Sequence, residues 1–285
     1  MIRTGTSMKL IYFHGFGSSG EGSTVKTLQE LLCDWVVLAP DIPVDSAEAL
    51  PFLKEFCKKE QPDVIVGTSM GGMYAQQMHG FKRICVNPAF DISKHKDILK
   101  EGTFEFFNPR KDGEKTFTIT PEVIQHFAQM EAHQFDGITD YDKEYVFGLF
   151  ADNDTTVNCE DIFLQHYRNV IHFRGEHRLN RQVIEEVIVP LAQELVRREY
   201  RWEYNGYTFV FRLDQQSASF EEIGRLDFSR YLLDIDVQGL MRALHITDLG
   251  QLAEEVKARF DYGIMEYFLK EHGIAYSTYY ESNFD

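Results

Sequence analysis

Short apolar runs recur along the chain and alternate with segments of helical period. Six runs of four to six residues are rich in β-branched and aromatic side chains, which predicts strands buried on both faces, as in a parallel sheet. These strands are expected at Met8–Phe13, Trp35–Leu38, Asp63–Val66, Arg83–Val86, Tyr145–Phe150 and Asn169–Phe173. Helices are expected between and after them, at Thr24–Cys33, Ser46–Cys57, Ser69–Gly80, Glu160–Tyr167 and Asn180–Val196. The alternation predicts an α/β fold, a three-layer sandwich with a mostly parallel sheet and right-handed crossovers.

The alternation is interrupted twice. Residues 91–141 are polar and contain a single predicted helix, Pro121–Met130, with Thr120 as its N-cap. So long an interruption in a compact domain indicates a lid or a binding insertion. After residue 198, two alternating segments flank Asn205-Gly206, which is the strongest short signal for a β-hairpin. We therefore expect a main domain at residues 1–198 and a small acidic α+β domain at residues 199–285, in which the hairpin precedes helices.

The predicted helices of the small domain follow from apolar periodicity alone. They are expected at Phe228–Leu244, Asp248–Phe260 and Gly263–Glu271.

Charge and cysteine content narrow the classes of function. The formal net charge of -16 argues against a nucleic-acid partner, because phosphate contacts require clustered Lys and Arg. None of the four cysteines forms a C-x-x-C pair or lies near a His at metal-ligand spacing, so neither a metal nor a disulfide is expected. The first residues do not resemble a signal peptide, and no run approaches the ~20 apolar residues of a membrane helix. The sequence thus predicts a soluble, cytoplasmic protein without membrane insertion.

A candidate nucleophile lies in Gly67-Thr68-Ser69-Met70-Gly71, which fits the pattern G-x-S-x-G. The pattern is meaningful only between a strand and a helix, and both are predicted here. Glycines permit the strained turn that lifts the serine hydroxyl above the sheet, with the next N–H at a helix N-terminus. The alternative is a glycine-rich turn in which Ser69 merely caps the helix.

A serine nucleophile needs a base and an acid, in the chain order Ser, Asp or Glu, His. Asp154 follows the fifth predicted strand and is favoured as the acid, with Asp152 as its rival. The alternative for either carboxylate is that it only caps a helix or shapes a turn. His177 lies after the sixth strand and is the expected base, whereas His172 lies within that strand. These independent placements agree and favour Ser69 as a nucleophile.

The oxyanion hole requires two N–H donors. Met70 supplies one, and the loop Phe13–Ser19 is expected to supply the other through Phe16, with Gly17 as the alternative. His14 precedes the nucleophile in the chain, so it is expected to brace this loop and not to act as the base. The loop lacks both the G-K-[ST] ending of a phosphate loop and the full G-x-G-x-x-G fingerprint, so nucleotide binding is not expected.

Four segments together resemble the α/β-hydrolase superfamily and, more narrowly, the YqiA/YcfP-type (UPF0227-like) esterases, which are small bacterial hydrolases. They are H-G-F-G-S-S, G-T-S-M-G-G-x-Y-A, V-N-P-A (Val86–Ala89) and G-E-H. The resemblance covers residues 8–197 and implies a cofactor-free esterase or thioesterase with Ser69, Asp154 and His177 as the triad. It also implies Phe16 and Met70 as oxyanion donors, and a loop at Asn87 beside the site. Residues 201–285 resemble no family.

The expected reaction is hydrolysis of small acyl esters or thioesters, of type EC 3.1, through an acyl-enzyme. Two alternatives remain open: hydrolysis of an amide or peptide bond on the same scaffold, and a non-catalytic binding or regulatory protein that retains the fold. Gly17 and Asn87 are expected beside the substrate. Apolar residues of the insertion are candidates either for lining an acyl pocket or for packing the insertion, namely Phe104, Phe106, Phe107, Phe117 and Phe127.

Overall fold

The computed structural model describes residues 8–213, 217–224 and 230–281, which form two compact units divided between Leu195 and Val196. The first unit contains a six-stranded sheet in the order β2-β1-β3-β4-β7-β8, and every neighbouring pair in it is parallel. Its strands are β1 (Lys9–Phe13), β2 (Val36–Leu38), β3 (Val64–Thr68), β4 (Arg83–Val86), β7 (Val146–Ala151) and β8 (Asn169–Phe173). The six predicted strands are confirmed.

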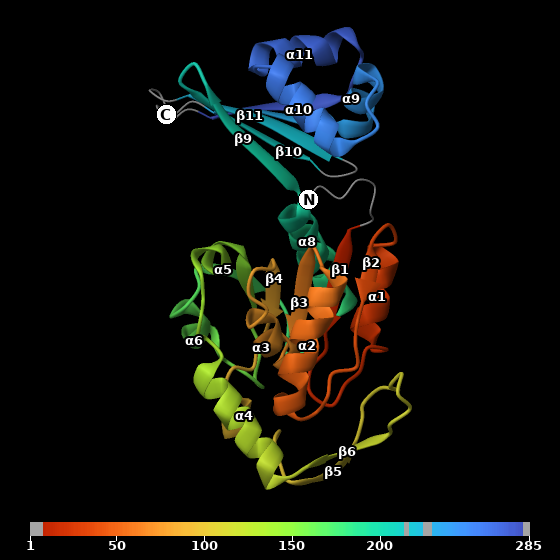
Figure 1. Cartoon of the computed structure of the whole chain (residues 1–285), viewed down its shortest axis with the longest axis vertical. Helices are drawn as coiled ribbons and strands as arrows, with labels where there is room; N and C mark the ends of the chain where they lie inside the picture. Colours follow the sequence, from red (N-terminus) through yellow and green to blue (C-terminus); the bar gives the residue numbers. More distant parts are fainter. Residues whose placement is uncertain (1–7, 214–216, 225–229, 282–285) are drawn as a thin grey trace. The chain divides into compact units, whose positions relative to one another are not determined.

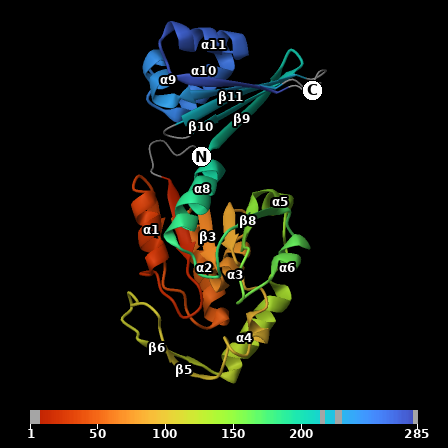
Figure 2. The same cartoon turned by 180° about the vertical axis from the view of Figure 1, so that it is seen from behind.

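Helices cover both faces of this sheet. Helix α2 lies in front of it in Figure 1, and α8 lies in front of it when the molecule is viewed from behind in Figure 2. The helices outside the insertion are α1 (Ser23–Leu31), α2 (Ser46–Glu60), α3 (Met70–Gln76), α5 (Asp140–Tyr145), α6 (Glu160–Leu164), and the continuous run α7 (Arg181–Val183), a π-helical turn (Ile184–Ile188) and α8 (Val189–Val196). The predicted three-layer α/β sandwich is therefore confirmed.

The segment between β4 and β7 contains more regular structure than its sequence predicts. The predicted helix is present as α4 (Pro121–His133), and the Thr120 side chain caps it by accepting the Val123 N–H. A short 3₁₀ turn (Ile92–Lys94) and an antiparallel hairpin of β5 (Gly102–Glu105) and β6 (Thr116–Ile119) precede the helix. In Figure 1 the hairpin and α4 lie at the end of the unit where the strands of the sheet finish.

The second unit is an antiparallel sheet with three helices. The sheet has the order β13-β12-β11-β10-β9, and β9 and β10 form the predicted hairpin around Asn205-Gly206. Its elements are β9 (Arg198–Tyr204), β10 (Tyr207–Leu213), β11 (Ser217–Gly224), β12 (Arg230–Asp236), α9 (Val237–Leu244), α10 (Leu249–Arg259), α11 (Tyr262–Glu271) and β13 (Tyr276–Glu281). The predicted α+β character is confirmed.

The helix predicted over Phe228–Leu244 is wrong in its first half. Phe228 lies outside the described residues, strand β12 occupies Arg230–Asp236, and only Val237–Leu244 is helical. Leu233 and Ile235 alternate along the strand and are buried against the helices of this unit. A short apolar run of this kind is ambiguous between strand and helix, and pairing with β11 decides it in favour of the strand.

Candidate active site

Ser69 lies on a strained turn between β3 and α3. Its backbone has φ 55° and ψ -121°, a conformation that costs a non-glycine residue on the order of 1–3 kcal/mol. Two backbone hydrogen bonds hold the turn: the Ser69 N–H donates to Val86 O at 2.9 Å, and Ser69 O accepts from the Ala89 N–H at 3.1 Å. The strain is therefore imposed by the surrounding chain and fixes the direction of the Ser69 side chain.

The glycines two residues either side of Ser69 are required by close backbone contacts. A Cβ placed at Gly67 would lie 2.1 Å from the Gly71 oxygen, and a Cβ placed at Gly71 would lie 2.1 Å from the Phe13 oxygen. No side chain can be accommodated at such distances. The glycines in G-x-S-x-G thus let α3 pack directly on both β3 and the end of β1.

The structure brings Ser69 together with His177 and Asp154. The Ser69 Oγ lies 3.0 Å from His177 Nε2, and His177 Nδ1 lies 2.7 Å from Asp154 Oδ2. The side chains of His177 and Asp154 are only 18% and 6% exposed. This is the chain of hydrogen bonds by which a carboxylate orients an imidazole and the imidazole accepts a serine proton.

The turn after β7 explains why Asp154 makes this contact and not Asp152. Asp154 Oδ1 accepts the backbone N–H groups of Thr156 at 2.8 Å and Val157 at 3.0 Å, which leaves Oδ2 for the imidazole. The Asp152 side chain is exposed, and its backbone N–H donates to Phe173 O. Of the two rivals left open by the sequence, the geometry favours Asp154.

The loop after β1 lies directly over Ser69. A Cβ placed at Gly15 would lie 3.5 Å from the Ser69 Cβ, so the loop contacts the serine one residue before Phe16. Met70 is the first residue of α3, and the first N–H groups of a helix have no acceptor within it. The positive end of the helix dipole also lies here. The backbone N–H groups of Phe16 and Met70 thus remain the candidates for an oxyanion hole.

His14 braces this loop, as its position before the nucleophile predicts. Its Nε2 accepts the Ile42 N–H at 3.0 Å, so Nδ1 carries the proton and donates to Gly15 O at 2.9 Å. Burial lowers the pKa of His14 to about 4, which keeps the ring neutral near pH 7. The side chain is 3% exposed and acts on the shape of the loop.

The hairpin of the insertion packs against the same loop. The Phe107 N–H donates to Gly17 O at 2.8 Å, and the rings of Phe16 and Phe117 meet edge to face with centroids 5.4 Å apart. Gly17 has φ 67°, and a Cβ there would lie 3.0 Å from the Phe107 ring, so glycine is required at this contact. The β5–β6 hairpin and the candidate oxyanion loop thus form one packed structure.

Three phenylalanines of the insertion differ in how far their side chains are exposed. Phe104 is 37% and Phe107 is 70% exposed, and the Arg178 guanidinium lies 5.9 Å from the centre of the Phe107 ring. Phe127 is fully buried in the core, where it packs the insertion against the sheet. Of the two expectations for Phe127, burial favours packing of the insertion over lining of the acyl pocket, whereas Phe104 and Phe107 are exposed.

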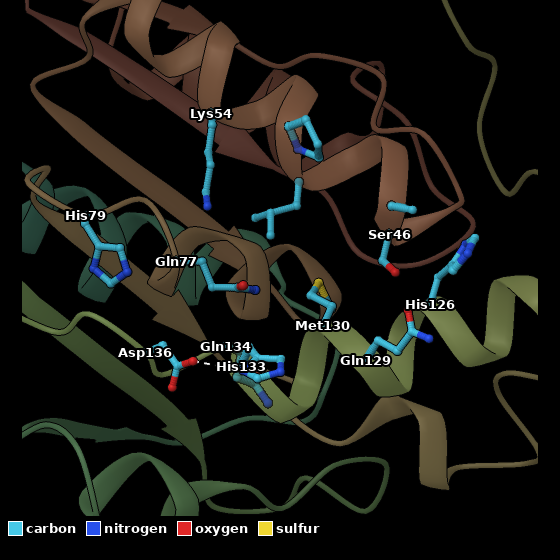
Figure 3. Close-up of a pocket in the computed structure, with 13 residues that line it drawn as sticks. Ser46, Lys54, Gln77, His79, His126, Gln129, Met130, His133, Gln134 and Asp136 are labelled. Atoms are coloured by element: carbon cyan, nitrogen blue, oxygen red, sulfur yellow. Dashed lines mark hydrogen bonds and ion pairs between the residues drawn. The ribbon is translucent and has the colours of Figure 1, made fainter.

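A separate cavity of about 500 Å³ lies between α2 and α4 (Figure 3). It is lined from the α2 side by Ser46 and Lys54 and from the α4 side by His126 and His133, among others. His126 and His133 are held through Nδ1 by hydrogen bonds of 2.9 Å to the carboxylates of Asp45 and Asp136. The lining contains no residue of the group around Ser69, so the chemistry of the candidate site does not take place there.

Two properties of the described residues bear on other classes of protein. Among residues 8–213, 217–224 and 230–281, no cluster of three or more His, Cys, Asp or Glu side chains has the arrangement of a metal site. In the same part of the chain, no helix is both long and apolar enough to cross a membrane.

The fold and the site define a class of protein. A parallel sheet with helices on both faces, a serine on a strained strand-to-helix turn, and an acid and a histidine after later strands are the features of the α/β-hydrolase fold. The protein belongs to the uncharacterised protein family UPF0227, whose sequence profile matches residues 9–181. The predicted resemblance is therefore confirmed for the first unit, and the match ends before the second unit begins.

Several solved structures are similar to this chain at low identity. Est1E from Butyrivibrio proteoclasticus is 18% identical with a TM-score of 0.47, covering 67% of this chain and 88% of that one. A thioesterase domain from the curacin biosynthetic pathway is 14% identical with a TM-score of 0.42, covering 67% and 91%. The peroxisomal α/β-hydrolase Lpx1 from Saccharomyces cerevisiae is 12% identical with a TM-score of 0.40, covering 68% and 76%. No curated protein matches the chain significantly. The function must therefore be argued from the residues of this chain.

Proposed function

We propose that the protein is a serine hydrolase that cleaves carboxylic esters or thioesters. The observation that carries the proposal is the hydrogen-bonded chain from Asp154 through His177 to Ser69, with distances of 2.7 and 3.0 Å. The serine has a base within hydrogen-bonding distance, and the base has a carboxylate to orient it. Ser69 also retains a strained backbone that a protein without catalysis has no need to maintain.

In the proposed reaction, His177 Nε2 accepts the proton of the Ser69 hydroxyl as Oγ attacks the acyl carbon. The negative charge on the carbonyl oxygen is stabilised by the N–H groups of Phe16 and Met70. The protonated imidazole, oriented by Asp154, then gives its proton to the departing alcohol or thiol. A water molecule, deprotonated by His177, attacks the acyl-enzyme, and the carboxylic acid leaves as Ser69 recovers its proton.

The substrate is proposed to bind beside the packed structure formed by the loop after β1 and the hairpin of the insertion. Phe107 provides accessible apolar surface beside Gly17, and the half-exposed Phe104 packs on the Phe117 ring of the same hairpin. This surface suits the acyl chain or another apolar part of an ester. Phe107 depends on its own backbone hydrogen bond to Gly17 for this position. A small-molecule acyl ester or thioester is thus the proposed class of substrate, and no cofactor takes part.

A panel of substrates tests the proposal. Purified protein is assayed with p-nitrophenyl esters and acyl-CoAs of increasing chain length, and with p-nitroanilides of the same acids. Turnover of esters or thioesters with release of equal amounts of acid and leaving group supports the proposal. Preferential cleavage of the anilides would instead identify an amidase, and no turnover of any member by folded protein would favour a binding protein.

The choice between Asp154 and Asp152 gives a specific prediction. Asp154→Asn is expected to lower kcat by roughly 10⁴-fold, because the amide can stabilise the wrong imidazole tautomer and cannot stabilise the imidazolium. Asp152→Asn makes the same chemical change two residues away at an exposed position and is expected to keep kcat within about twofold of wild type. Steady-state ester hydrolysis measures both. A large loss in the Asp152 variant with little loss in the Asp154 variant would reverse the assignment.

The cysteines support a cytoplasmic location as part of the proposal. All four are unpaired, and Cys57, Cys85 and Cys159 are buried. Burial raises the pKa of each of these three thiols to about 12, which makes them unreactive. Unpaired cysteines of this kind are typical of a reducing compartment.

A further inference from the structure

The segment Val86–Ala89, which begins at the last residue of β4, contacts the turn that carries Ser69. Strand β4 lies between β3, which leads to Ser69, and β7, which leads to Asp154. Val86 O accepts the Ser69 N–H, and the Ala89 N–H donates to Ser69 O. The segment therefore binds both the backbone N–H and the backbone carbonyl of the serine. A Cβ at Gly72 would lie 3.1 Å from the Pro88 Cβ, so the segment also packs on the first turn of α3.

The side chain of Asn87 connects this segment to the other two groups of the site. Its Oδ1 accepts the Ala151 N–H at 2.9 Å, and its Nδ2 lies 3.3 Å from both Glu176 O and His177 O, to which it donates. Ala151 O in turn accepts the Asp154 N–H at 3.3 Å. A single amide group therefore ties the start of the acid turn to the backbone of the histidine itself.

Asparagine is the residue type that this position requires. The amide provides an acceptor for Ala151 and donors for the two carbonyls in one plane, which neither a carboxylate nor an aliphatic side chain can do. Asn87 has φ 41°, in the left-handed region that Asn tolerates better than most other residues. Its side chain is buried, with the residue 3% exposed, and both ends of the amide are occupied. These contacts replace the expectation that Asn87 lines the substrate pocket.

We infer that Asn87 is a positioning residue that keeps His177 aligned with Ser69 and with the Asp154 turn. The inference rests on the proposed function, because alignment matters only if His177 transfers a proton. The imidazole is fixed at Nδ1 by Asp154, but its backbone lies in a loop between β8 and α7. The Asn87 amide holds this backbone at a fixed distance from Ala151, where the turn that carries Asp154 begins. It thereby sets the position of the His177 ring between Ser69 Oγ and the Asp154 carboxylate.

The variant Asn87→Asp tests the inference with little change of shape. It keeps the acceptor for the Ala151 N–H and the tolerance for positive φ, but it loses both donated bonds and turns a carboxylate oxygen toward two carbonyls. We expect kcat for p-nitrophenyl acetate to fall about 100-fold, as for a misplacement of the reacting groups by about 1 Å, with KM within about threefold of wild type. Asn87→Gly keeps the positive φ and removes the whole amide, and we expect a similar fall in kcat.

A double-mutant cycle separates positioning from a general loss of structure. If Asn87 acts through His177, then adding Asn87→Asp to His177→Ala is expected to lower the residual single-turnover rate by less than about threefold, because the group being positioned is already absent. The matched control is Asn180→Asp, which adds the same charge three residues after His177. Asn180 caps α7 by accepting the Val183 N–H, and Asp serves equally well as a cap, so kcat is expected to stay unchanged.

Three results would overturn the inference. The first is a wild-type kcat in either folded Asn87 variant. The second is a rise in KM with kcat unchanged, which indicates a substrate contact. The third is a full 100-fold loss of rate in the His177→Ala background, which indicates a general structural role. Failure of the proposed function is distinguishable, because in that case wild-type protein either hydrolyses no member of the substrate panel or cleaves the anilides in preference to the esters and thioesters.

Discussion

Replacement of Ser69 by Ala is expected to lower kcat for ester hydrolysis by about 10⁶-fold while the protein remains folded. The serine, the histidine and the acid act as a unit, so removal of the nucleophile abolishes nearly all of the benefit of the other two groups. The residual rate derives from substrate binding and from the N–H groups of Phe16 and Met70, which the substitution leaves in place. Steady-state assays on protein verified by circular dichroism measure the loss. A decrease of less than tenfold would exclude Ser69 as the nucleophile.

The strained backbone at Ser69 adds a prediction about stability to the same experiment. Ala at φ 55° is strained as Ser is, whereas Gly adopts positive φ without penalty. Ser69→Gly is therefore expected to be as inactive as Ser69→Ala but about 1 kcal/mol more stable toward urea. Equal stability of the two variants would show that the turn stores no strain.

The second large effect is expected on stability, at Arg83. The Arg83 guanidinium is fully buried at the start of β4 and donates to the Asp142 carboxylate and to Gln76 O. Arg83→Met fills a similar volume but leaves the Asp142 charge buried without its guanidinium partner, which is expected to cost about 3–5 kcal/mol. Asp142→Asn added to this variant should recover part of the loss, because the uncompensated charge is then gone. Urea denaturation of the two variants measures both changes.

Asp142 also makes stability depend on acid pH. Burial opposes its ionisation, but the N–H of Thr139 and the charge of Arg83 outweigh burial and lower the pKa from 3.8 to about 2. The unfolded chain therefore binds this proton at higher pH than the folded protein. The stabilisation is complete above about pH 4 and is lost as pH falls toward 2, with a total of about 2 kcal/mol. Urea denaturation between these pH values should show a shallower decline for Asp142→Asn. An unchanged decline would mean that other carboxylates account for it.

The sequence predicts most of the first unit because its strands carry local signals. Strands covered on both faces are continuous apolar runs, and each of the six was located within about two residues. The β5–β6 hairpin lacks such a signal, since its strands are largely exposed and pair only with each other. Strand β12 carries a misleading signal, because its apolar residues also fit a helical period and only its partners β11 and β13 settle the matter.

The candidate site was predictable to the extent that chain order specifies it. Ser69 and His177 each follow a recognisable strand, chain order excludes His14, and His172 lies within a strand. The sequence favours Asp154 over Asp152 but leaves the choice open, because both lie in one turn and the orienting N–H groups of Thr156 and Val157 are visible only in the folded structure. The contacts of Asn87 were equally out of reach, since they join segments 64 and about 90 residues apart.

The most direct test of the central claim is labelling by a fluorophosphonate, which reacts with a serine hydroxyl only when a base activates it and an oxyanion hole is present. Wild-type protein is incubated with the probe, and the modified peptide is identified by mass spectrometry, with Ser69→Ala and His177→Ala as controls. The account predicts a single adduct on Ser69, no adduct in the Ser69 variant and labelling slowed by several orders of magnitude in the His177 variant. Correctly folded wild-type protein that remains unlabelled, or that is labelled at another serine, would contradict it.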